Sequence, residues 1–353
     1  MMYWAALVLS LIVAAILVPI VIRYATQFGA IDHAGREERK IHKYAVPRAG
    51  GVAIYLSFVL VCLVLLPKIT QNFIGLLLAG TIVLLVGLYD DVKGLSPWIK
   101  LCFQILAAAV AVVGFGISID TITNPFGQAI SLSSKVPPLA IGPFQVGAGL
   151  IAAVLSIIWL VGITNTINLL DGLDGLSGGV SAIAAFIVFL LAISPSVNQP
   201  DTALIAITLT GASLGYLVYN FYPAKIFNGD SGAYFLGMTL GILAIFSGAK
   251  LATAALVLGV PIFDAIWAFI RRIATGRSPF SADRGHFHHL LIDVGLSQRQ
   301  AVLLIYAISI TFGLIALIAN TGQKVIAIAT LICLMVTSVV FLTLLRRRKN
   351  TSS

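Results

Sequence analysis

Two carboxylates and two amides lie close together in the segment from Asn165 to Gly179, NTINLLDGLDGLSGG. Asn165, Asn168, Asp171 and Asp174 are spaced three residues apart, which on a helix would place them along a slowly drifting stripe. The interleaved glycines favour a loop instead, because glycine-rich backbone lets N–H groups approach a nucleobase or phosphate closely. The alternative is a turn whose aspartates only cap the next helix.

Further carboxylates occupy two other polar segments. GLYDDVKGL contains the adjacent Asp90 and Asp91, which repel each other unless a cation or a shared proton relieves them. YNFYPAKIFNGDSG contains Asp230. A solvated loop pair and a helix N-cap are the simple alternatives for these residues. Three segments that each supply hard oxygen ligands favour Mg²⁺, or Mn²⁺ in its place, over Zn²⁺.

A third kind of segment combines histidines with arginines in RRIATGRSPFSADRGHFHHLLIDVGLS. Its candidate binding residues are Arg277, Arg284, His286, His288 and His289. The run His-x-His-His could indicate a transition metal, but the segment has no HExxH pattern and no cysteine, and arginines attract phosphate rather than a cation. Anion binding is therefore the favoured interpretation of this segment and of the basic residues around Lys43. The alternative is that these basic residues only provide the positive charge that is common beside a membrane.

The elements that carry these residues are strongly apolar. The 353 residues are 59% hydrophobic and 10% charged, with a mean hydropathy of +1.04, and they contain repeated apolar runs of about 17–22 residues, the length that spans a bilayer. We therefore predict a single all-α polytopic integral membrane domain over residues 1–353, with about ten or eleven transmembrane helices. The expected spans are 3–22, which we interpret as a retained anchor, 49–66, 71–89, 98–117, 147–163, 178–194, 201–219, 231–247, 250–269, 299–318 and 325–345.

The basic residues predict the orientation of these spans, because cytoplasmic loops are enriched in Lys and Arg. With the N-terminus outside and the C-terminus in the cytoplasm, only Lys68, Lys135, Lys250 and Lys324 of the 22 basic residues lie outside. The net charge of +9 is thereby explained without a nucleic-acid partner. The predicted cytoplasmic loops are 23–48, 90–97, 164–177, 220–230 and 270–298, and the external loop is 118–146. All the polar motifs share the cytoplasmic side, which predicts that the chemistry of these residues takes place there.

Five motifs together resemble one family. YDDVKG, NTINLLDGLDGLSGG, FNGDSG, SPFSADRGHFHH and RKIHKYAVPRAGG are similar to motifs of the polyprenyl-phosphate N-acetylhexosamine-1-phosphate transferases. VPRAGG and HFHHLL resemble the WecA-like branch, whereas the phospho-N-acetylmuramoyl-pentapeptide transferases usually carry TPTMGG and three consecutive histidines. The latter activity is the alternative.

The resemblance implies an enzyme of the cytoplasmic (inner) membrane whose active site faces the cytoplasm. It would transfer N-acetylglucosamine-1-phosphate, or a related N-acetylhexosamine-1-phosphate, from a UDP-sugar to undecaprenyl or another polyprenyl phosphate and release UMP, the first membrane step of a cell-envelope glycan. The family also allows a homodimer. Two other classes stay open: an ion-coupled transporter, although only Asp264 lies close to the inside of a span where transporters bind their substrates, and a histidine-dependent membrane metalloprotease.

The resemblance also implies residue roles. Asp230 would be the chief Mg²⁺ ligand with Asn168 as a second, and Asp90 and Asp91 the acceptor-side catalytic carboxylates. The remaining implied contacts concern the donor. Uracil would be held by Gly172, Leu173, Asn220 and Phe227, and the nucleotide or its phosphates by Lys43. Asp171 and Asp174 would shape the loop, and Asn165 would belong to the substrate site. The diphosphate or sugar would be held by Arg277, Arg284, His286, His288 and His289.

Overall fold

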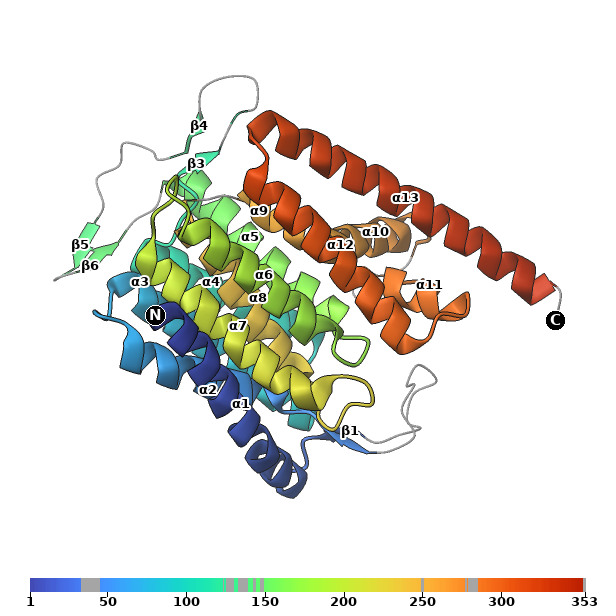
Figure 1. Cartoon of the computed structure of the whole chain (residues 1–353), viewed down its shortest axis with the longest axis horizontal. Coiled ribbons are helices and arrows are strands. Elements are labelled where there is room, and N and C mark those ends of the chain that lie inside the picture. The colour runs from blue at the N-terminus through green and yellow to red at the C-terminus, as the bar shows by residue number, and fades with distance from the viewer. Residues whose placement is uncertain are drawn as a thin grey trace.

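The described residues form an α-helical bundle with three short pairs of antiparallel strands (Figure 1). The computed structural model describes residues 1–32, 45–122, 124, 130–132, 139–141, 144–146, 149–248, 251–276, 278 and 285–351. The helices are α1 (Met2–Gln27), α2 (Gly50–Leu65), α3 (Gln71–Lys93), α4 (Pro97–Ala109) with a π-helical turn η1 (Val110–Gly114), α5 (Leu150–Leu170), α6 (Leu176–Ala192), α7 (Pro200–Asn220), α8 (Gly229–Phe246), α9 (Leu251–Val257), α10 (Gly259–Ala274), α11 (Phe287–Asp293), α12 (Gln298–Ile318) and α13 (Thr321–Thr351).

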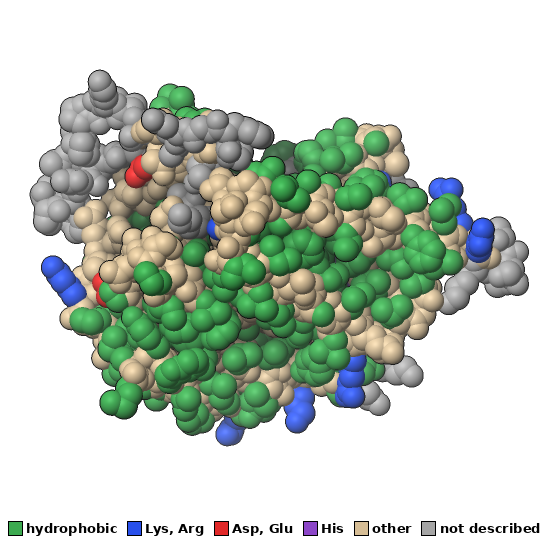
Figure 2. Space-filling view, turned by 45° about the horizontal axis from the view of Figure 1, so that its top comes forward, with side chains coloured by type: hydrophobic (Ala, Val, Ile, Leu, Met, Phe, Trp, Pro, Cys, Tyr) green, Lys and Arg blue, Asp and Glu red, His purple; other side chains and the backbone are tan. Residues whose placement is uncertain are grey.

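The polytopic all-α prediction is confirmed. Among the described residues, eight helices are long and apolar enough to cross a membrane, or nine if α9 and α10 form one bent span, and α2 and α6 are shorter apolar helices. Each of the eleven predicted spans coincides with a helix or with two consecutive ones. Figure 2 shows the expected surface, on which hydrophobic side chains cover most of the visible face and Lys and Arg lie toward its edges.

Two local predictions differ from the structure. Residues 164–170, expected in a loop, continue α5 as far as Leu170, because glycine begins only at position 172 and the polar residues before it are compatible with a helix. The expected straight span 250–269 is instead two helices, α9 and α10, bent by 81°.

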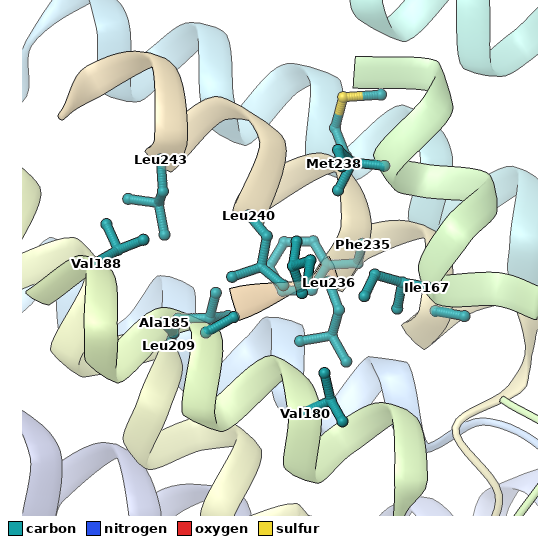
Figure 3. Packing of buried hydrophobic residues seen from close by; sticks show 14 of the residues in the cluster. Ile167, Val180, Ala185, Val188, Leu209, Phe235, Leu236, Met238, Leu240 and Leu243 are labelled. Carbon is teal, nitrogen blue, oxygen red and sulfur yellow. The ribbon is translucent and has the colours of Figure 1, made fainter. Parts of the chain in front are cut away.

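Helix α8 lies at the centre of the bundle. Nearly all of it is buried, and it packs against α2, α3, α5 and α6. Figure 3 shows how this core is filled: Leu236, Leu240 and Leu243 of α8 lie among apolar side chains of α5, α6 and α7. A helix that is apolar on every side belongs in the interior, so the N-terminus of α8 is held in place by surrounding helices.

The strand pairs lie outside the helical core. Strands β1 (Ile31–Asp32) and β2 (Val46–Pro47) pair antiparallel with Ile31 opposite Pro47. Strands β3 (Thr121–Ile122) and β4 (Ile130–Ser131), and β5 (Leu139–Ile141) and β6 (Phe144–Val146), form two more antiparallel pairs. In Figure 1, β3–β6 lie toward one end of the bundle, whereas β1 and α11 lie toward the other.

Candidate active site

Three helix ends bring the predicted acidic residues together. Asp90 and Asp91 lie in the last turn of α3, Asn168 lies in the last turn of α5 with Asp171 directly after it, and Asp230 is the second residue of α8. Hydrogen bonds link Asp91 and Asn168 directly to Asp230. The segments around residues 90, 168 and 230, far apart in the sequence, therefore form one polar cluster.

Asp230 is the centre of this cluster. Its Oδ2 accepts hydrogen bonds from Lys100 Nζ at 2.9 Å and from the Tyr234 hydroxyl at 2.8 Å, and its Oδ1 accepts one from Asn168 Nδ2 at 2.9 Å. The Lys100 ammonium also lies 3.1 Å from Asp90 Oδ2. Lys100 was not among the predicted site residues, although a lysine inside the predicted span 98–117 is itself a signal of function.

Asp91 has a different environment from its neighbour. Its Oδ1 accepts the Asp230 N–H at 2.9 Å, and its Oδ2 accepts the Ser231 N–H at 3.2 Å and the Ser231 hydroxyl at 2.9 Å. Arg48 Nε lies 3.9 Å away, and the Asp91 side chain is 0% exposed. Because α8 has no side-chain cap from its own N-cap residue, Asp91 satisfies N–H groups that the helix itself leaves without partners.

Asp90 is less enclosed than Asp91. Its Oδ1 accepts the Leu95 N–H at 2.6 Å, and its side chain is 12% exposed, the same as that of Asp230 and unlike the fully enclosed Asp91. Of the three carboxylates, Asp90 and Asp230 are therefore the two that a substrate could touch.

The loop between α5 and α6 begins with Asp171, which accepts a hydrogen bond from the Ser177 hydroxyl. Burial raises the pKa of Asp171 to about 8, although Ser177 and Arg48 counteract this. Asn228 Nδ2 lies 3.3 Å from the same hydroxyl. The predicted loop-shaping role therefore has a physical basis, because Asp171 connects the loop to the first turn of α6.

The predicted uracil residues lie around the same loop. Asn220 Oδ1 accepts the Gly175 N–H at 3.0 Å, and its Nδ2 donates to the Ile226 carbonyl at 2.8 Å. Asp174 Oδ2 accepts the Ala224 N–H at 2.9 Å. Asn220 and Asp174 thus join loop 171–175 to loop 221–228. Leu173 is buried. Gly172 lies in loop 171–175, and Phe227 lies in loop 221–228.

Phe227 also joins the site to the segment after β2. Its N–H donates to the Pro47 carbonyl at 2.8 Å, and its own carbonyl accepts the Gly50 N–H at 2.9 Å. This pairing places Arg48 beside Phe227. Gly175, with φ +82° at the start of α6, supplies the left-handed turn that the loop needs.

The histidine segment meets the loop at Gly172. His286 and His288 are buried and His289 is half-buried. His288 Nε2 occupies the space where a Cβ on residue 172 would lie, so a glycine is required there. Burial lowers the pKa of His288 to about 3, and this ring is therefore neutral at physiological pH.

Other predicted residues stand apart. Asn165 Nδ2 donates to Gln104 Oε1 at 2.6 Å and to the Val161 carbonyl at 2.9 Å, so it joins α5 to α4 about one turn away from Asn168. Lys43, Arg277 and Arg284 lie outside the described residues.

The carboxylates of this cluster suit a magnesium ion that is bound partly by the protein and partly by substrate phosphates. Among the described residues, no three His, Cys, Asp or Glu side chains are grouped closely enough to hold a metal ion. Asp90 and Asp230, however, already share one positive charge, that of Lys100. Mg²⁺ is typically bound by one or two carboxylates together with substrate phosphates and waters, and Asp230, with Asp90 close by, fits that description.

The chain is similar to known transferases. Residues 73–248 match the family model described as glycosyl transferase family 4. The chain is 34% identical to a probable undecaprenyl-phosphate N-acetylglucosaminyl 1-phosphate transferase of Bacillus subtilis, over 90% of this chain and 85% of the relative. It is 33% identical to the decaprenyl-phosphate N-acetylglucosaminephosphotransferase of Mycolicibacterium smegmatis, over 80% and 73%, and 33% identical to an undecaprenyl-phosphate alpha-N-acetylglucosaminyl 1-phosphate transferase of Pasteurella multocida, over 82% and 80%.

Proposed function

Because the chain belongs to glycosyl transferase family 4, we propose that it transfers N-acetylglucosamine-1-phosphate from UDP-N-acetylglucosamine to a polyprenyl phosphate. The observation that carries the proposal is the pair of partly exposed carboxylates, Asp90 and Asp230, joined by Lys100 at the ends of apolar helices. The names of the relatives favour N-acetylglucosamine over the muramoyl-pentapeptide alternative.

The reaction forms one P–O bond and breaks another. An oxygen of the lipid phosphate attacks the sugar-linked phosphorus of the UDP-sugar, and the bond from that phosphorus to the bridging oxygen breaks, so that UMP leaves with the bonding electrons. Asp90 would take up the last proton of the acceptor phosphate. The ammonium of Lys100 would stabilise negative charge that develops on the phosphoryl oxygens.

Magnesium would be held by Asp230 together with phosphate oxygens of the substrate, and when bound it would supply positive charge to the diphosphate. Asn168, through its amide N–H to Asp230 Oδ1, orients the ligand carboxylate, as partners of metal ligands commonly do. Asp91 acts through α8: it fixes the backbone of Asp230 and Ser231 and has no exposed surface for the acceptor. Lys43 and the histidine segment would contact the donor.

One assay tests the proposed function. Membranes containing the protein are incubated with UDP-N-acetylglucosamine labelled in the sugar, polyprenyl phosphate and Mg²⁺. We expect label in the butanol-extractable lipid and an equal amount of UMP. Release of UDP would instead indicate ordinary glycosyl transfer and would contradict the proposal.

The metal assignment has its own test. Adding a chelator in excess of Mg²⁺ should stop the transfer, and restoring Mg²⁺ or Mn²⁺ should recover it. Asp230→Asn keeps the shape of the side chain but removes a hard anionic ligand, so it should abolish turnover in protein that still elutes as a folded species. Near-normal turnover of Asp230→Asn at saturating Mg²⁺ would rule out Asp230 as the chief ligand.

A further inference from the structure

Two buried ionisable side chains on α10 lie beside the histidine segment. Asp264 is 4% and Arg272 is 7% exposed, within a helix that is otherwise largely apolar. Ionised groups are rarely buried without a partner, because their desolvation costs several kcal/mol. Both side chains contact the segment Gly285–His288, and neither belongs to the carboxylate cluster around Asp230.

The Asp264 carboxylate joins the helix α10 to the start of α11. Its Oδ1 accepts the Phe287 N–H at 2.8 Å, and its Oδ2 lies 3.1 Å from His286 Nδ1. The same Oδ2 lies 3.8 Å from His288 Nδ1. One carboxylate therefore binds the backbone at residue 287 and orients the His286 ring, on which the His288 ring is stacked.

The arginines of α10 complete this attachment. Arg272 Nη2 lies 3.4 Å from His286 Nε2, and Arg271 Nη1 donates to the Gly285 carbonyl at 2.6 Å. Because a guanidinium only donates hydrogen bonds, His286 Nε2 must accept, and the proton of a neutral His286 lies on Nδ1, toward Asp264. A carboxylate that orients an imidazole in this way also fixes its tautomer.

His288 connects this arrangement to loop 171–175. Its ring is stacked on that of His286, with centroids 5.7 Å apart and an interplanar angle of 11°, and lies 4.3 Å from that of His289. His288 is 1% exposed and fills the space beside Gly172. The position of the histidine segment therefore also determines how loop 171–175 can lie.

We propose that Asp264, together with Arg272, is a positioning residue for donor binding: it holds His286 and His288 in place so that the histidine segment docks on Gly172 and presents His289 to the diphosphate. This inference rests on the proposed function for the identity of the ligand. It assigns Asp264 no contact with the substrate. It also makes α10, the second half of the bent span, the element that carries one wall of the donor site.

The test compares Asp264→Asn with Asp293→Asn. Asn keeps one acceptor oxygen but loses the charge, so we expect KM for UDP-N-acetylglucosamine to rise about ten- to a hundredfold, the factor that corresponds to one charge-assisted hydrogen bond, while KM for the lipid stays unchanged. Asp293 lies at the end of α11, is 30% exposed and pairs with Arg346 at 3.2 Å; its variant should stay within about twofold of the wild type.

A second measurement reports the ring positions directly. Diethyl pyrocarbonate modifies accessible imidazoles, and mass spectrometry identifies the modified residue. In the wild type, His286 and His288 should resist modification relative to His289, and in Asp264→Asn both should become reactive. If Asp264→Asn does not fold, Asp264→Glu, which keeps the charge on a longer side chain, takes its place, with the same rise in KM expected and partial protection of the rings.

The outcomes separate this inference from the proposed function. A folded variant with a normal KM for the donor, or with both rings still protected, would overturn the positioning role. A lower kcat at unchanged KM would indicate only a smaller active fraction and would also overturn it. If the wild type releases no UMP, the proposed function fails, whereas the protection of His286 and His288 can still be measured.

Discussion

The two adjacent aspartates at the end of α3 have different surroundings, and they should behave differently when changed. Asp91→Asn replaces an acceptor of three hydrogen bonds with an amide whose N–H groups oppose those of α8. We expect a loss of about 1–3 kcal/mol in unfolding free energy, seen as a melting temperature lower by several degrees in detergent, together with a loss of transfer activity that high pH does not restore.

Asp90→Asn should give the opposite pattern. Its side-chain oxygen can still accept from Leu95 N–H, so the melting temperature should stay close to that of the wild type. Transfer should fall about tenfold or more and recover in part above pH 7, because the acceptor phosphate, with a second pKa of about 6, ionises without a base. Equal pH profiles for the two variants would contradict the division of roles.

A second measurement tests the direct attack of the lipid phosphate. If label from the UDP-sugar is retained on the protein in the absence of lipid, the reaction has a covalent intermediate, which would contradict this mechanism.

Asp171 and His288 should make stability depend on pH in opposite directions. The native pKa of Asp171 is raised to about 8, so its contribution to stability is greatest below about pH 4, the unfolded value, and is lost as the pH rises to 8. The native pKa of His288 is lowered to about 3, so its contribution is present above about pH 6.5 and is lost as the pH falls. Between pH 6.5 and 8, Asp171 is the one of these two groups that makes the unfolding free energy change with pH.

We therefore expect Asp171→Asn to flatten the decline of unfolding free energy between pH 6.5 and 8, where one group contributes at most about 1.4 kcal/mol per pH unit. Thermal melts across this range measure the slope. The same slope in the wild type and in Asp171→Asn would show that the carboxyl is already ionised in the native protein.

Several residues of the cluster could be predicted from local patterns, and others could not. Asp90, Asp171 and Asp230 each stand out as carboxylates in an apolar chain. Lys100 and Asp264 do not form a motif with their sequence neighbours, and their partners come from other helices. Their signal was an ionisable residue inside a predicted span, which indicates that a partner exists but not which one.

At the scale of elements, the position of α8 depends on very close contacts between helix backbones. A Cβ on Gly51 of α2 would overlap with the backbone of Gly232, and a Cβ on Gly87 of α3 with that of Ser231. Small residues at such places let membrane helices approach closely. Helix pairing of this kind sets the location of Asp230 relative to Asp90.

Gly51→Ala and Gly87→Ala should therefore each destabilise the protein by about 1–3 kcal/mol or more, the typical cost of overpacking, and reduce transfer. Gly162→Ala in α5 is the matched control, because nothing lies within 4 Å of its Cβ position and alanine favours a helix. The measurement is melting temperature with activity per folded protein. A Gly51→Ala variant as stable as Gly162→Ala would disprove the close contact.

The bend between α9 and α10 shows what hydropathy cannot predict. Residues 250–269 are apolar enough to form one span. The prediction placed a break only before them, between the spans 231–247 and 250–269. Pro261 lacks the N–H that would bond the Val257 carbonyl, so the helix can change direction there. A proline near a glycine was the available signal, but its effect on direction depends on the neighbouring helices.

For the whole molecule, the orientation in the membrane is still a prediction from charge. Single cysteines at Ser278 and Ser196, in a background with Cys62, Cys102 and Cys333 replaced by serine, would test it. A membrane-impermeant thiol reagent should label the cysteine at 278 only in inside-out vesicles and the one at 196 only in intact cells, because basic residues keep the former loop in the cytoplasm. The reverse pattern would place the catalytic cluster outside.

The length of α13 has a further consequence. Its 31 residues extend about 46 Å, whereas the hydrocarbon layer is about 30 Å thick, so roughly three turns of an upright α13 extend into the headgroup region. That projecting end carries Arg346, which is paired with Asp293 of α11. The exposed pair marks the depth of α11 in the bilayer, close to the lipid headgroups, but contributes little to holding the histidine segment in place. The phosphate of a membrane-embedded lipid resides at that same level, so the acceptor can react without being lifted out of the bilayer.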